Sequence, residues 1–134
     1  MDPTGVLRHA LAHESDVRLA VLFGSEARGA RTPRGDLDVG VLGPHAPGRL
    51  DALAVALSRA THETVDVIDL SAAPPLLRFE IARDGIVVHE AEPHLWSDFK
   101  ARAFLDWWDW APLARRFAGA AAARLRAGHG HGPA

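Results

Sequence analysis

The chain has 134 residues, of which 48% are hydrophobic and 24% charged, and its formal net charge at pH 7 is −2. This composition indicates one soluble globular domain, and the near-neutral charge gives no support for a broadly basic surface that binds nucleic acid or an anionic membrane. The sequence has no cysteine, no signal peptide and no apolar run of transmembrane length, which excludes disulfides and thiol catalysis and favours a cytoplasmic location.

The first predicted elements are a helix and a strand. Residues 4–14 carry an apolar stripe at helical spacing, and Thr4 is predicted to cap this helix. Residues 16–23 form the first predicted strand, because they end in a short, continuously apolar run. Gly24 then permits the sharp change of backbone direction that a strand-to-loop turn needs.

A loop rich in glycine and arginine follows this strand. Ser25 is predicted to cap a short helical turn, whose free backbone amides would bind an anion. Arg28 has two interpretations: it contacts a triphosphate, or it pairs with nearby acidic side chains. The second interpretation is favoured for Arg31 and Arg34.

Residues 37–42 form the second predicted strand, at the start of which lie two aspartates. Side chains alternate between the faces of a strand, so Asp36 and Asp38 are expected to point the same way. Two such carboxylates repel each other unless a cation lies between them, and hard oxygen ligands favour Mg²⁺ or Mn²⁺. An anion-binding turn beside this pair is what nucleotidyl transfer requires. The alternative is a hairpin with exposed aspartates at a sheet edge.

The next four predicted elements are a helix, a strand, a helix and a strand, over residues 49–61, 65–70, 75–82 and 86–89. The third strand contains Asp66 and Asp69. Because these residues are three apart, they lie on opposite faces, and only one of them can join Asp36 and Asp38. Asp69 is predicted to be a cap or loop contact at the end of the strand.

The C-terminal part is predicted to be a long helix rich in aromatic residues. It spans residues 94–111, Pro112 kinks or ends it, and residues 113–125 continue helically. Its apolar residues occupy more than one face, which indicates either core packing or a second contact surface for a partner. Its tryptophans are Trp96, Trp107, Trp108 and Trp110. The predicted domain is 1–127, and 128–134 is predicted to be a disordered tail.

The spacing Gly24-Ser25, ten residues, Asp36-x-Asp38 resembles the signature of the polymerase-beta-like nucleotidyltransferase superfamily. The longer string GSEARG…GDLDVGV is similar to the minimal nucleotidyltransferases (MNT), the antitoxin partners of HEPN-domain toxins. This resemblance implies an α/β fold with a small mixed sheet of about four strands, flanked by helices. It assigns the third carboxylate to Asp66, and nucleotide binding to Gly24, Ser25 and Arg28.

The resemblance also implies a function. A member of this group transfers AMP from ATP to a tyrosine of a HEPN ribonuclease toxin, with two Mg²⁺ ions (Mn²⁺ is possible) held by Asp36, Asp38 and Asp66. The absence of an added acceptor-binding domain favours a protein acceptor, contacted in part by the Trp-rich helix. The alternatives are a non-catalytic antitoxin that binds its toxin through that helix, and a small-molecule nucleotidyltransferase. The sequence itself identifies neither the base nor the number of AMP units transferred.

Overall fold

The computed structural model describes residues 2–24 and 36–130. Its elements follow the predicted order. They are α1 (Pro3–Leu11), β1 (Leu19–Phe23), β2 (Leu37–Leu42), α2 (Arg49–Thr61), β3 (Val65–Asp69), a 3-10 turn (Leu70–Ala72), α3 (Pro75–Asp84), β4 (Ile86–Glu90) and α4 (Leu95–Gly130).

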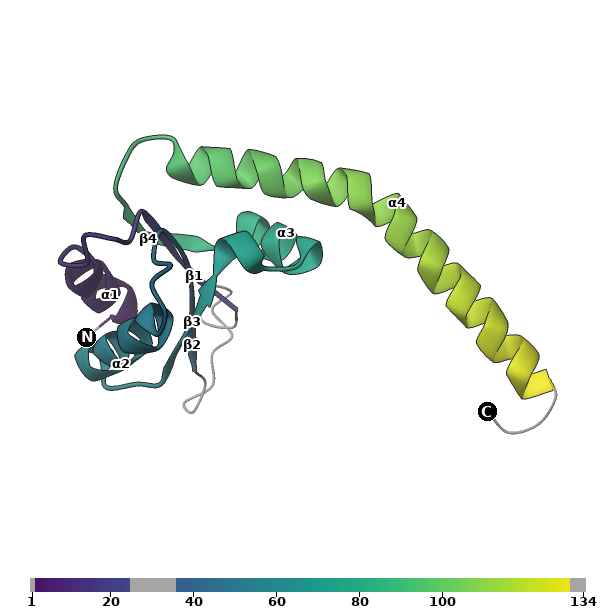
Figure 1. The fold of residues 1–134 in the computed structure, drawn as a ribbon, viewed down its shortest axis with the longest axis horizontal. Coiled ribbons are helices and arrows are strands. Elements are labelled where there is room, and N and C mark those ends of the chain that lie inside the picture. The colour runs from purple at the N-terminus through teal and green to yellow at the C-terminus, as the bar shows by residue number, and fades with distance from the viewer. Residues whose placement is uncertain (1, 25–35, 131–134) are drawn as a thin grey trace.

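The four strands form one mixed sheet in the order β3-β2-β1-β4. Strand β1 pairs antiparallel with both β2 and β4, and β2 pairs parallel with β3. Helices α1 and α2 cover one face, whereas α3 and the first part of α4 cover the other (Figure 1). The predicted α/β fold with a mixed sheet of four strands and a long C-terminal helix is therefore confirmed.

Strand β1 is buried on both faces, which explains why its sequence is continuously apolar rather than alternating. Ala20 and Leu22 pack in the core beneath α1 and α2. Leu19 and Val21 pack on the opposite side, with residues of α3 and α4. Because β1 runs antiparallel to β2, its C-terminal end lies beside the beginning of β2, where Asp38 is found.

Several predicted boundaries were wrong, such as the end of α1, which lies at Leu11 rather than at residue 14, and two of them have a polar cause. Helix α1 is capped by Asp2, whose carboxylate accepts a hydrogen bond from the Thr4 backbone N–H at 3.2 Å, so Thr4 is not the cap. Strand β1 begins at Leu19 rather than at residue 16, because Asp16 lies in the preceding connection and pairs with Arg49. Both differences arise from polar side chains, to which a hydrophobic pattern is insensitive.

Arg49, at the start of α2, holds the α1–β1 connection through a charged network. Its Nε lies 2.6 Å from one carboxylate oxygen of Asp16, and its Nη2 lies 2.7 Å from the other and 2.7 Å from Glu14 Oε2. The hydrogen bonds from Arg49 hold the pKa of the Asp16 carboxyl below its usual value. A lowered pKa in the folded state means that the ionised form of Asp16 stabilises the fold.

Arg49→Met is expected to lower the free energy of unfolding by about 1 kcal/mol at pH 7, a value kept small because the network is partly exposed. The stabilisation from Asp16 is present above its unfolded-state pKa of about 3.9 and is lost as the pH falls through the lower folded-state value. Urea denaturation of both proteins should therefore show a smaller difference at about pH 3 than at pH 7. Arg59→Met, in the last turn of the same helix, is the control. An equal difference at both pH values would contradict this assignment.

Helix α4 does not end at Pro112 but continues to Gly130, so the predicted helical segment over residues 113–125 is part of the same helix. Figure 1 shows that it is bent about midway, which is the effect expected of a proline inside a helix. Residues 128–130, predicted to belong to a disordered tail, are helical, and 131–134 lie outside the described residues. The domain boundary at residue 127 stays a prediction. Within residues 2–24 and 36–130, no helix is both long and apolar enough to span a bilayer.

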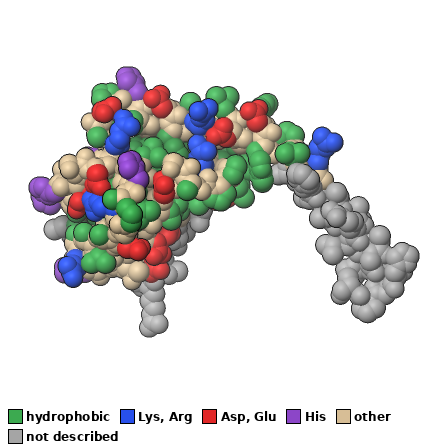
Figure 2. All heavy atoms as spheres, viewed as in Figure 1, with side chains coloured by type: hydrophobic (Ala, Val, Ile, Leu, Met, Phe, Trp, Pro, Cys, Tyr) green, Lys and Arg blue, Asp and Glu red, His purple; other side chains and the backbone are tan. Residues whose placement is uncertain are grey.

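The aromatic residues of α4 divide between packing and exposure. Trp107 stacks on Phe79 of α3 with ring centroids 5.2 Å apart, and Trp96 stacks on Phe99 at 5.8 Å. By contrast, Trp108 is 79% exposed and Leu105 is 63% exposed. Figure 2 shows hydrophobic side chains along α4 where it leaves the body of the domain. The helix thus has one face for the core and further apolar side chains that face solvent.

Candidate active site

Asp38 and Asp66 lie side by side on adjacent strands. They are register partners in the parallel pair formed by β2 and β3. Leu37 and Val39, the strand neighbours of Asp38, belong to the core beneath α1 and α2. Because side chains alternate along a strand, Asp38 and its partner Asp66 project from the other face of the sheet, which α3 and α4 cover.

Gly24 comes directly after β1, the strand that pairs with β2 on the side away from β3, and its backbone lies next to Asp38. The preceding residue, Phe23, is the register partner of Asp38. Gly24 has φ +80°, and a Cβ atom added to it would lie 2.6 Å from Asp38 Oδ2. A glycine is therefore needed here for two reasons: its backbone has a positive φ, and a side chain would collide with the carboxylate of Asp38.

The electrostatics of the site centre on Asp38. Partial burial raises the pKa of its carboxyl above the usual value, and the negative charges of Asp66 and Asp36 raise it further. Asp36 is exposed and immediately precedes β2. The three predicted carboxylates thus interact electrostatically, and their ionisation leaves an excess of negative charge that a bound cation would offset.

The donor chemistry of this group fits a hard divalent cation. Carboxylate oxygens are the ligands that Mg²⁺ and Mn²⁺ prefer. In residues 2–24 and 36–130, no three acidic, histidine or cysteine side chains are gathered closely enough to hold a metal ion. Asp38 and Asp66 are the pair with the right chemistry on one face of the sheet, and the charge of Asp36 acts on Asp38.

Ser25 and Arg28, the other predicted nucleotide-binding residues, lie outside the described residues, as do Arg31 and Arg34. Gly24 is therefore the one residue of the anion-binding part of the motif that the structure describes. The contacts of Ser25 and Arg28 with phosphate stay predictions.

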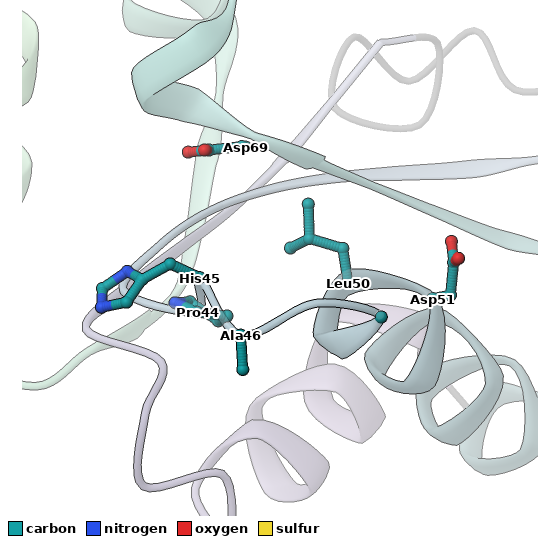
Figure 3. Close-up of a pocket in the computed structure, with 7 residues that line it drawn as sticks. Pro44, His45, Ala46, Leu50, Asp51 and Asp69 are labelled. Carbon is teal, nitrogen blue, oxygen red and sulfur yellow. The ribbon is translucent and has the colours of Figure 1, made fainter.

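Asp69 faces away from this site, as its spacing from Asp66 predicted. It accepts hydrogen bonds from the backbone N–H of Ser71 at 2.9 Å and from the Ser71 hydroxyl at 2.7 Å, and so caps the 3-10 turn. Figure 3 shows it extending above the loop that carries His45, with Leu50 and Asp51 rising from α2. These side chains line a cavity of about 390 Å³, which therefore lies across the sheet from Asp38.

A smaller cavity, of about 160 Å³, adjoins Gly24, the residue that approaches Asp38. It lies between the end of β1 and helix α3 and is lined by Phe23, Gly24, Leu77, Glu80, Ile81 and Asp84. Glu80 was not recognised in the sequence, because no motif contains it. Its position one residue before the buried Ile81 is the one feature that places it near the core.

The chain matches a nucleotidyltransferase family in sequence and resembles solved toxin–antitoxin structures in fold. Residues 6–94 match the family described as polymerase beta, nucleotidyltransferase. A solved toxin–antitoxin structure with AMP-PNP is 18% identical, with a TM-score of 0.75 over 90% of this chain and 98% of that one. An MntA–HepT toxin–antitoxin structure is 17% identical, with a TM-score of 0.70 over 89% and 96% of the two chains.

A third solved structure holds a tri-AMPylated Shewanella oneidensis HEPN toxin in complex with an MNT antitoxin. It is 17% identical, with a TM-score of 0.69, and the match covers 88% of this chain and 98% of that one. No curated protein sequence matches the chain significantly. At these identities, the structural likeness establishes the fold.

Proposed function

Because the chain belongs to the polymerase beta nucleotidyltransferase family, we propose that it is an antitoxin that transfers AMP from ATP to a tyrosine of a HEPN ribonuclease toxin. The observation that carries this proposal is the register pairing of Asp38 with Asp66 beside Gly24. The solved structures with AMP-PNP and with an AMPylated HEPN toxin support the choice of nucleotide and acceptor. The chain contains no tyrosine, so transfer to tyrosine would occur on another molecule.

Asp36, Asp38 and Asp66 would hold two Mg²⁺ ions, or Mn²⁺. When bound, these ions neutralise charge on the triphosphate and lower the pKa of the attacking hydroxyl. Gly24 keeps the backbone close to Asp38, so that Ser25 and Arg28 in the following loop would receive the β- and γ-phosphates next to the carboxylates. The acceptor oxygen bonds to the α-phosphorus as the bond to the bridging oxygen breaks and pyrophosphate leaves.

Asp66 would accept the proton that the acceptor hydroxyl loses. It lies on β3, an edge strand of the sheet, and its side chain is exposed. An acceptor on a separate protein can therefore approach Asp66 without displacing another strand. Asp38, on the inner strand β2, lies between Asp66 and Gly24, which suits it to the α-phosphate rather than to the acceptor.

Intact-mass analysis of a HEPN partner, incubated with this protein, ATP and Mg²⁺, tests the proposal directly. The expected result is a mass gain of one or more AMP units on the partner. A stable complex without any gain would favour a non-catalytic antitoxin, a second candidate that the exposed apolar side chains of α4 support.

The partner contact is proposed to involve the exposed part of α4, which includes Trp108. Trp108→Ala is expected to weaken binding of the toxin by about 30-fold or more, because a large aromatic side chain at an interface is commonly a hot spot. Its high exposure in the free chain predicts an unchanged melting temperature. Binding is measured by titration calorimetry, with Val55→Ala on α2, 50% exposed, as the control. Unchanged affinity in the Trp108 variant would place the contact elsewhere.

A further inference from the structure

We propose that the cavity between β1 and α3 holds the base of the nucleotide, and that Glu80 recognises an exocyclic amino group on this base. This inference rests on the proposed nucleotidyl transfer and adds to it the part of the site that distinguishes one triphosphate from another. It concerns only residues of β1, Gly24 and α3, all of which the structure describes.

The cavity and the carboxylate site share Gly24. This residue lines the cavity, and a Cβ atom added to it would lie 2.6 Å from Asp38 Oδ2. Phe23 and Asp38 are register partners, so the cavity opens one strand away from the carboxylate on the same side of the sheet. A nucleotide with its α-phosphate at Asp38 would therefore reach this cavity with its base.

The walls and size of the cavity suit a flat heterocycle. Phe23, Leu77 and Ile81 supply apolar surface. The volume of about 160 Å³ has room for several water molecules and therefore for a flat base. With the base there and the α-phosphate at Asp38, the ribose and phosphates would lie towards Gly24 and the carboxylates.

Among the described residues, two acidic side chains line the cavity, and they differ in what they already bind. Arg83 holds the carboxylate of Asp84 through its Nε, at 3.1 Å from each oxygen, and through its Nη2, at 2.8 Å from Oδ2. These contacts offset the charge of Asp84. Glu80, one turn earlier and half-buried, interacts with Arg83 only through its charge, and it forms no hydrogen bond with the described part of the chain. Glu80 is therefore the acceptor available to a ligand.

A carboxylate in this position favours a base that offers a hydrogen-bond donor. It accepts hydrogen bonds and donates none when ionised, so it complements the 6-amino group of adenine. The base of inosine triphosphate (ITP) has a carbonyl oxygen at the same place, whose lone pairs would face the negative charge of Glu80. ITP would thus bind more weakly because its carbonyl oxygen would lack a hydrogen-bond donor and would be repelled by Glu80. The shapes of the two bases would not cause the difference.

The test compares the affinities of ATP and ITP, measured by calorimetry on the full chain with Mg²⁺. The wild type is expected to bind ITP at least about tenfold more weakly than ATP, the effect of one hydrogen bond to a charged group. Glu80→Gln should reduce this ratio to about threefold or less, because the amide can donate to the inosine oxygen. Glu92→Gln, an exposed glutamate near Arg18, should leave the ratio unchanged.

Several outcomes would overturn the inference. If Glu80→Gln keeps the ratio while ATP binding and AMP transfer persist, only the role of Glu80 is wrong. If the variant changes only the dependence on acceptor concentration, the cavity holds the acceptor. If the wild type binds neither nucleotide, the proposed nucleotidyl transfer fails as well. Leu77→Phe, which narrows the cavity, provides a second variant and should weaken ATP and ITP together.

Discussion

Asp66→Asn is expected to reduce AMP transfer by about a thousandfold, whereas Asp69→Asn should change it by no more than about threefold. Both aspartates belong to β3, and the two substitutions are chemically identical. Asp66 lies beside Asp38, where its charge would hold a cation and receive the acceptor proton. Asp69 lies on the other face and caps a turn, a role that asparagine also performs.

Transfer is followed by intact mass of the acceptor over time, and partner binding is measured in parallel to confirm that each variant still forms the complex. Asp38→Asn should behave like Asp66→Asn, because its charge also contributes to the site. Equal loss of transfer in the Asp66 and Asp69 variants would mean that β3 matters for stability rather than for chemistry. If the Asp66→Asn variant transfers AMP at the full rate, Asp66 has no role in the reaction.

Gly24→Ala is expected to lower transfer by about 100-fold, with a loss of about 1–2 kcal/mol in the free energy of unfolding. The positive φ of Gly24 accounts for the stability loss. The larger effect on transfer arises because the new Cβ would lie 2.6 Å from Asp38 Oδ2 and so would push this carboxylate out of place. The end of an aspartate can move at little cost, so the fold survives while the site does not.

Gly48→Ala is the matched control. Gly48 has φ +76°, close to that of Gly24, but an added Cβ would meet nothing within 4 Å. It should show a similar loss of stability by urea denaturation and normal transfer kinetics. If the two alanine variants lose transfer equally, backbone strain alone explains the result, and the contact between Gly24 and Asp38 has no functional importance.

Local patterns in the sequence predicted the secondary structure and the faces of its side chains. The apolar run from Leu19 to Phe23 identified β1, and period-two alternation placed Asp66 and Asp69 on opposite faces. Both inferences depend only on neighbours along the chain. The same pattern predicted that Asp36 and Asp38 point the same way, but Asp36 lies just before β2, so this expectation stays a prediction.

Contacts between segments distant in sequence were not predictable in this way. The register that pairs Asp38 with Asp66 depends on how β2 and β3 align across the α2 connection. The approach of Gly24 to Asp38 depends on the pairing of β1 with β2, and the cavity beside Glu80 depends on how α3 packs on β1. Hydrophobic periodicity carries no information on these alignments, because many registers satisfy it equally well.

The acidic residues of β2 and β3 and the exposed apolar side chains of α4 belong to different elements, and this has a genetic consequence for the proposed roles. If partner capture and chemistry depend on these two different elements, a copy that lacks Asp38 still occupies its toxin. In a cell that also makes the intact protein, such a copy would withhold toxin from active molecules, so that transfer would fall in proportion to its expression. A copy altered at Trp108 would not compete. The first class of allele would therefore be dominant for toxin modification and the second recessive.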